Sequence, residues 1–192
     1  MTTTNREDWL SAAVSELRPF FEAVGKPLPA NVRVTCGFPS NAKRSGAIGE
    51  CWADTASADK TFEVLISPVL DDPVKVFEVL VHELCHATAG AMNHNVNFQR
   101  VGNLMHLAPS PTKAGWKATG QAATFASTYG EIIKSLDAYP HAALSMTTKK
   151  TQGTRMLKAV CPSCGYTVRL TSKWAALGLP SCPQDDDILN LV

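Results

Sequence analysis

The chain has 192 residues, of which 45% are hydrophobic, so it can bury one sizeable core and a small appendage. Its net charge of +1 excludes a whole-chain electrostatic argument for a nucleic-acid partner. No apolar stretch is long enough to span a bilayer, and the N-terminus lacks the basic segment and apolar run of a signal peptide. We therefore expect a cytoplasmic protein, in a reducing compartment where its six cysteines are not a disulfide scaffold.

The first part of the chain predicts one helix followed by a small sheet. Apolar residues recur at helical intervals from Arg6 to Val24, and Asn5 precedes them as a candidate N-cap. Alternating or β-branched segments then predict strands at 31–36, 48–52 and 61–67. These strands lead directly into a further helix, so we predict an α+β domain with a small sheet packed on that helix.

The helix after the third strand carries the strongest chemical signal. Asp72 and Pro73 are a typical N-cap and first helical residue, and an apolar stripe follows them. The sequence His82-Glu83-Leu-Cys-His86 is the H-E-x-x-H pattern. Positions four apart lie on one helix face, so His82 and His86 can bind one metal ion while Glu83 takes a proton from water. This pattern indicates hydrolase chemistry, most often peptide-bond hydrolysis.

A catalytic zinc site usually has three protein ligands, so a third ligand is expected. His94 is the preferred residue, because it follows His86 by eight positions and begins a helix predicted from Asn95 to about Leu107. Three other residues remain as competitors for this role: His106, Glu131 and His141.

Beyond this region we predict a Pro- and Gly-rich surface connection at 108–120 and another helix at about 119–136. A basic linker is expected at 141–154, because residues there lack any periodicity. The segment 138–184 contains six basic residues and no acidic residue, which concentrates positive charge in the C-terminal part of the chain.

The last segment, 155–192, predicts a small zinc-ribbon-like domain. Cys161 and Cys164 form a C-x₂-C pair, and Cys182 follows after 17 further residues, within the range of zinc ribbons. Asp185 occupies the position of the missing fourth cysteine. Two interpretations stay open: a zinc site completed by Asp185 or a distant histidine, or a ribbon without metal. We favour zinc, because so small a domain has little core of its own.

These motifs together resemble the SprT-like (Spartan-type) metallopeptidase domain. HELCHA and the later HNVNF (94–98) resemble its H-E-x-x-H helix and third-histidine segment, with Asn95 in place of the usual glycine. The resemblance extends to IGECW (48–52), VLISPVLDDP (64–73), YPHAAL (139–144) and the cysteine-containing end, as in short phage and actinobacterial members. It implies a zincin-like fold at 1–140, with catalytic zinc on His82, His86 and His94, Glu83 as general base, and, for a phage protein, the host cytoplasm.

The predicted function is therefore a zinc-dependent metallopeptidase that acts on a protein or peptide. DNA-associated proteins are a candidate substrate class, with DNA bound by the basic C-terminal region. The alternatives are a non-catalytic DNA- or protein-binding adaptor that keeps the zincin fold, and a metal-dependent hydrolase of a non-peptide substrate.

Overall fold

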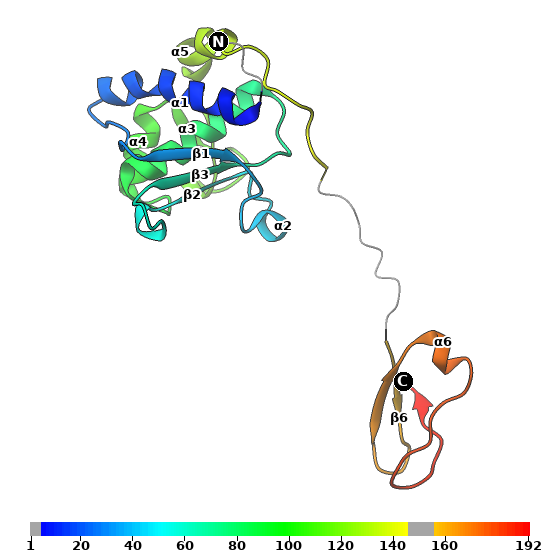
Figure 1. The fold of residues 1–192 in the computed structure, drawn as a ribbon. Coiled ribbons are helices and arrows are strands. Elements are labelled where there is room, and N and C mark those ends of the chain that lie inside the picture. The colour runs from blue at the N-terminus through cyan, green and yellow to red at the C-terminus, as the bar shows by residue number, and fades with distance from the viewer. Residues whose placement is uncertain (1–4, 146–155) are drawn as a thin grey trace. The chain divides into compact units, whose positions relative to one another are not determined.

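The structure is a computed structural model that describes residues 5–145 and 156–192, and it divides into two compact units, 1–146 and 147–192 (Figure 1). The predicted linker lies outside the described residues from position 146 onward. Its first residues belong to unit 1, because Arg6 donates to the carbonyl of Ala142 at 2.7 Å and the amide of Leu144 donates to Pro68 O at 2.9 Å.

In chain order, unit 1 contains α1 (Arg6–Ala23), β1 (Val32–Cys36), α2 (Ala42–Ser45), β2 (Gly49–Trp52), the 3-10 helix η1 (Asp54–Ala56), β3 (Phe62–Ile66), α3 (Pro73–Ala89), α4 (Val96–Leu104), β4 (Leu107–Pro109), the 3-10 helix η2 (Gly115–Lys117), β5 (Thr119–Gln121) and α5 (Phe125–Ser135). Unit 2 contains β6 (Leu157–Val160), β7 (Thr167–Leu170), α6 (Ser172–Ala175) and β8 (Asn190–Leu191).

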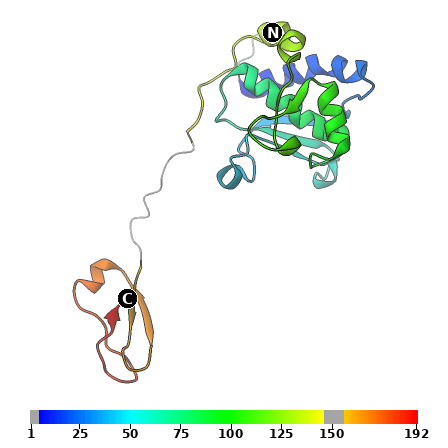
Figure 2. The same ribbon diagram turned by 180° about the vertical axis from the view of Figure 1, so that it is seen from behind.

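A three-stranded sheet of order β1-β3-β2 forms one layer of unit 1. β1 runs parallel to β3, and β2 runs antiparallel to it, so β2 is an edge strand. Helix α3 packs against β2 and β3, and α1 packs against β1 and α3. Seen from behind, α3 and α4 lie in front of the strands (Figure 2). This arrangement confirms the predicted α+β class.

The core of unit 1 holds α3 in place. Trp9 of α1, Phe77 of α3 and Tyr129 of α5 are all fully buried, with ring centroids 6.5 Å apart for Trp9–Phe77 and 5.4 Å apart for Phe77–Tyr129. The predicted start of α3 is confirmed, since the Asp72 side chain accepts a hydrogen bond from the Lys75 amide at 3.0 Å. At the other end, Gly90 terminates the helix in the left-handed conformation, with φ 59°. Both ends of α3 are therefore capped.

The other predicted elements of unit 1 are confirmed with small shifts, but the stretch 107–124 differs. The helix expected at 119–136 begins only at Phe125. Residues 119–121 instead form β5, which pairs with β4 inside the supposed surface connection. The helical prediction failed here because Thr119 and Gly120 are poor helix formers and the chain gains a strand partner at 107–109.

Unit 2 is a three-stranded antiparallel sheet of order β7-β6-β8 with a very small core. Its fully buried cluster contains only Ala159, Cys161, Cys182 and Leu189 among the described residues. Domains with so small a core usually have a further cross-link or a bound metal. Across both described segments, 5–145 and 156–192, no helix is long and apolar enough to cross a bilayer.

Candidate metal centres

Three histidine side chains converge at the C-terminal half of α3. His82 Nε2 lies 3.2 Å from His86 Nε2 and 3.1 Å from His94 Nε2. The two α3 histidines meet because they are one turn apart on the same face. His94 reaches them because the chain reverses after Gly90 and α4 follows directly, capped by Asn95, whose side chain accepts from the amides of the first turn.

Each of these rings is held by its other nitrogen. The Nδ1 of His82 lies 2.6 Å from Thr119 Oγ1, that of His86 lies 2.6 Å from Ala91 O, and that of His94 lies 2.5 Å from Trp116 O. A carbonyl oxygen only accepts hydrogen bonds, so His86 and His94 must carry their protons on Nδ1. Their Nε2 atoms therefore present lone pairs toward His82.

The donor set fits a metal ion. A cation among these ring nitrogens would be stabilised by their lone pairs, and neutral imidazole nitrogens are common zinc ligands. For zinc–nitrogen bonds of about 2.0–2.1 Å in a tetrahedral arrangement, two ligand nitrogens lie about 3.3 Å apart. The observed separations of 3.1 and 3.2 Å are close to that value.

Burial keeps two of these rings neutral. Desolvation lowers the pKa of His86 to about 4, and it lowers that of His82 well below its usual value, with the neighbouring histidines adding to the effect. At neutral pH these rings are deprotonated, so they can bind a metal without first releasing a proton.

The ring of Phe98 packs against the histidine rings. The residue is fully buried, and its ring stacks on His86 and His94 with centroids 4.2 and 4.5 Å away. Phe98 therefore anchors α4 in the core. A rigid aromatic support of this kind keeps ligand rings in one orientation.

Glu83 lies beside the three histidines, as the H-E-x-x-H pattern predicts. Its side chain is only 5% exposed, and burial raises its pKa to about 8, with a smaller contribution from the charge of Glu50. No hydrogen bond to its carboxylate comes from any residue that the structure describes. Glu83 and the three histidines line one open cleft of about 730 Å³.

The wall of this cleft includes the edge strand β2, since all of Gly49–Trp52 lines it. The sequence did not indicate which strand is the edge next to the site, and the structure identifies β2. The lining also includes Lys117, Ala118 and Thr119, from the segment predicted to be a surface connection.

The competing third ligands lie elsewhere. His106 Nδ1 is bonded to Thr124 Oγ1 at 2.7 Å, and Glu131 accepts from Lys134 at 2.7 Å. Neither they nor His141 join a group with His82 within the described part of the chain, where His94 is the third member.

Sequence reasoning missed the groups that orient the histidines. Two of the three are backbone carbonyls, which no residue pattern reveals. The third is the side chain of Thr119, whose contact with His82 could be predicted only if the strand β5 were already known.

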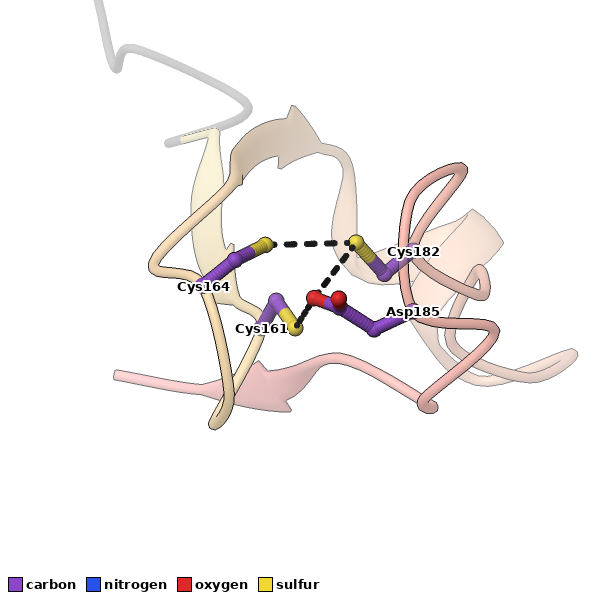
Figure 3. A group of neighbouring side chains, drawn as sticks. All are labelled: Cys161, Cys164, Cys182 and Asp185. Atoms are coloured by element: carbon purple, nitrogen blue, oxygen red, sulfur yellow. Dashed lines mark hydrogen bonds between the residues drawn. The ribbon is translucent and has the colours of Figure 1, made fainter.

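A second group in unit 2 brings together the four residues predicted for it (Figure 3). Asp185 Oδ2 lies 3.5 Å from Cys161 Sγ and 3.6 Å from Cys182 Sγ, and Cys164 Sγ lies 3.4 Å from Cys182 Sγ. Around one zinc ion with Zn–S of about 2.3 Å, ligand atoms lie about 3.5–3.8 Å apart. The spacing therefore also fits a metal.

The two turns that carry these ligands have the same backbone pattern. In the first, the Cys161 amide donates to Tyr166 O and the Gly165 amide donates to Cys161 O, at 2.8 and 3.1 Å. In the second, the Cys182 amide donates to Asp187 O and the Asp186 amide donates to Cys182 O, at 2.7 and 3.0 Å.

The residue at the fifth position of each turn has positive φ, 78° at Gly165 and 55° at Asp186. Asp185 therefore occupies, in the second turn, the place that Cys164 has in the first.

Comparison of the chain with family models, with curated proteins and with solved structures gives no match. The SprT-like resemblance accordingly stays a prediction from the motifs. The two side-chain groups and the cleft are therefore the observations that bear on function.

Proposed function

We propose that this protein is a zinc-dependent metallopeptidase of the SprT-like type, with a zincin-like unit 1 and a zinc-ribbon-like unit 2. The observation that carries the proposal is the convergence of His82, His86 and His94 beside the buried Glu83 in an open cleft. A purely structural metal site has four protein ligands and needs no adjacent carboxylate, whereas this group has three.

Zinc held by these histidines supplies Lewis acidity that polarises a carbonyl and lowers the pKa of water toward neutrality. The other parts of the chemistry belong to the chain. Glu83 is the general base: its carboxylate takes a proton from the attacking water and returns it to the leaving amine. Burial raises the pKa of Glu83 to about 8 in the metal-free protein, and a zinc ion bound beside it would favour the ionised carboxylate that accepts the proton of water.

The cleft supports binding of an extended polypeptide. β2 pairs with β3 on one side only, so its other edge offers unpaired backbone groups along the cleft. An extended chain is bound there by β-addition, with its backbone hydrogen-bonded to the strand and its scissile carbonyl directed toward the histidines. This binding mode favours unfolded segments, because a folded substrate cannot present a free strand.

DNA-associated proteins are the proposed substrate class, and the support is the charge of the C-terminal part. Lys158, Arg169 and Lys173 belong to unit 2, while the other three basic residues of segment 138–184 (Lys149, Lys150 and Arg155) lie outside the described residues. Unit 2 also contains the acidic residues Asp185, Asp186 and Asp187, so its six basic residues give it a net charge of +3. A positive excess of this kind favours phosphate contacts without sequence preference.

The second zinc of the proposal is structural and is held by Cys161, Cys164, Cys182 and Asp185. Support comes from the equivalence of the two turns and from the four-residue core of unit 2, which metal binding would supplement. All four positions carry protein ligands, so this site has no open position for substrate.

The test is cleavage of an unstructured protein by the zinc-loaded chain, with and without DNA, for the wild type and Glu83→Gln. We expect wild-type cleavage and a turnover about 10²- to 10⁴-fold lower for the variant, because only the general base is removed. Zinc content, measured by elemental analysis, must be equal in both proteins. Equal inactivity under every metal and DNA condition would instead favour the adaptor function, and cleavage restricted to a non-peptide substrate would favour the third alternative.

A further inference from the structure

Gly49 stands at the closest approach between the edge strand and the helix that carries the proposed general base. It is the first residue of β2 and pairs with Ile66 of β3. Its backbone does not adopt the positive φ that favours glycine, so chain conformation does not explain its presence. The space around it does.

A methyl group at this position would collide with the catalytic side of α3. An ideal Cβ built on Gly49 overlaps Oε1 of Glu83 and lies 2.6 Å from Val79 Cγ1 and 3.0 Å from Glu83 Cδ. Real Cβ atoms essentially never show contacts below 3.0 Å. Of the other described glycines, none meets an atom below that limit, and the tightest, Gly102, has 3.1 Å to a Trp116 ring carbon.

The surroundings decide which group would move. The strand cannot retreat easily, because it is paired along its length with β3 and the adjoining Ile48 carbonyl accepts from the Ser67 amide at 2.9 Å. Val79 is 6% exposed and is packed in the core. The Glu83 carboxylate is the end of a flexible side chain, and no residue that the structure describes donates a hydrogen bond to it. It is therefore a group that shifts away from a side chain at position 49, whereas the collision with Val79 remains and lowers stability.

We propose that Gly49 is a positioning residue for Glu83: the missing side chain leaves the space in which the carboxylate lies between β2 and the three histidines. This inference rests on the proposed function for the role of Glu83. Contact with the bare backbone of Gly49, rather than a hydrogen bond, sets where the general base lies. A side chain at position 49 displaces that base and leaves the histidine ligands in place.

The experiment compares Gly49→Ala with Gly130→Ala in the full-length, zinc-loaded chain. Gly130 lies in α5 with no atom within 4 Å of a built Cβ, so it receives the same change without a collision. Misplacing a catalytic group by about 1 Å costs roughly 10²-fold in rate. We expect Gly49→Ala to lower kcat by about that factor with KM and zinc content unchanged, and Gly130→Ala to retain the wild-type kcat. A kcat for Gly49→Ala within threefold of the control, at equal zinc content, would overturn the proposal.

A second measurement covers the case in which Gly49→Ala folds poorly or the wild type cleaves nothing. The midpoint of urea unfolding is measured for wild type, Gly49→Ala, Glu83→Ala and the double variant. We expect Gly49→Ala to lower the midpoint in the wild-type background and to lower it by less when Glu83 is already alanine, because only the collision with Val79 then remains. Equal decreases in both backgrounds would show that the collision is not with Glu83, and the proposal would fail. This cycle needs no catalysis, so it separates failure of the Gly49 proposal from failure of the peptidase proposal.

Discussion

Thr119→Val should weaken zinc binding at the three-histidine site without altering the fold. Thr119 is the one side chain among the three groups bonded to a ligand Nδ1, since the other two are backbone carbonyls. Valine has the same shape and the same preference for strands, so β5 keeps its pairing with β4. The substitution therefore removes one hydrogen bond and little else.

The magnitude follows from the 2.6 Å contact between Thr119 Oγ1 and His82 Nδ1. A metal on Nε2 leaves the proton on Nδ1, and valine leaves this half-buried donor without a partner. An unpaired buried donor costs about 1–3 kcal/mol, which corresponds to roughly 5- to 150-fold in affinity. Loss of a partner to a metal-bound histidine typically costs 10–100-fold. We expect a decrease in zinc affinity of roughly 10- to 100-fold.

The assay is competition with a chromophoric chelator, repeated with cobalt to separate the two sites of the full-length chain. Cobalt in unit 2 gives thiolate charge-transfer bands, which the histidine site lacks. Only the histidine site should weaken, and Thr119→Ser should bind as the wild type does, because it keeps the hydroxyl. Affinity of Thr119→Val within twofold of the wild type would refute the reasoning that Thr119 orients His82.

Three further outcomes are expected. Asp185→Ala should weaken zinc binding in unit 2 while Asp185→Cys retains it, as measured by the thiolate bands of cobalt; equal binding by both variants would exclude Asp185 as a ligand. In metal-free protein, Glu83 has a folded-state pKa of about 8 against the ordinary 4.5, so the folded chain binds the extra proton between these values. Stability relative to Glu83→Gln should therefore fall with rising pH across that window, on the order of 1 kcal/mol per unit, in urea titrations; a flat difference would contradict this. Phe98→Ala should lower the free energy of unfolding by about 3–5 kcal/mol, whereas Val96→Ala, at a position 57% exposed on the same helix, should change it by less than about 0.5 kcal/mol.

The parts of the fold that were predictable from sequence depend on local signals. Asp72, Pro73 and Gly90 mark the ends of α3, and the spacing of His82 and His86 places both on one face. Such signals lie within one or two helical turns, so they persist whatever the element packs against. The strands β1, β2 and β3 were likewise recognisable from alternation, although their order in the sheet was not.

The unpredicted parts depend on contacts distant in sequence. β4 and β5 have three residues each, too few for any periodicity, and they exist because they pair with one another. Trp116 O orients His94 from 22 positions away, through a backbone atom that every residue type has. The role of Gly49 also depends on a residue distant in sequence. A glycine in a strand usually indicates a bulge or bend, and only the position of Glu83 shows that a side chain at position 49 would collide with it.

The site combines residues that bear the proposed chemistry with residues that orient them. The proposed ligands and the proposed base come from α3 and from His94, which precedes the N-cap of α4, whereas η2 and β5 supply the partners of His82 and His94 and also line the cleft. Because one short segment both holds the rings of His82 and His94 and lines the cleft, we expect a substitution that reshapes this part of the lining to alter metal affinity as well. Variants that change substrate preference at Lys117 or Ala118 should consequently be judged by turnover per bound zinc, since activity per protein would combine the two effects.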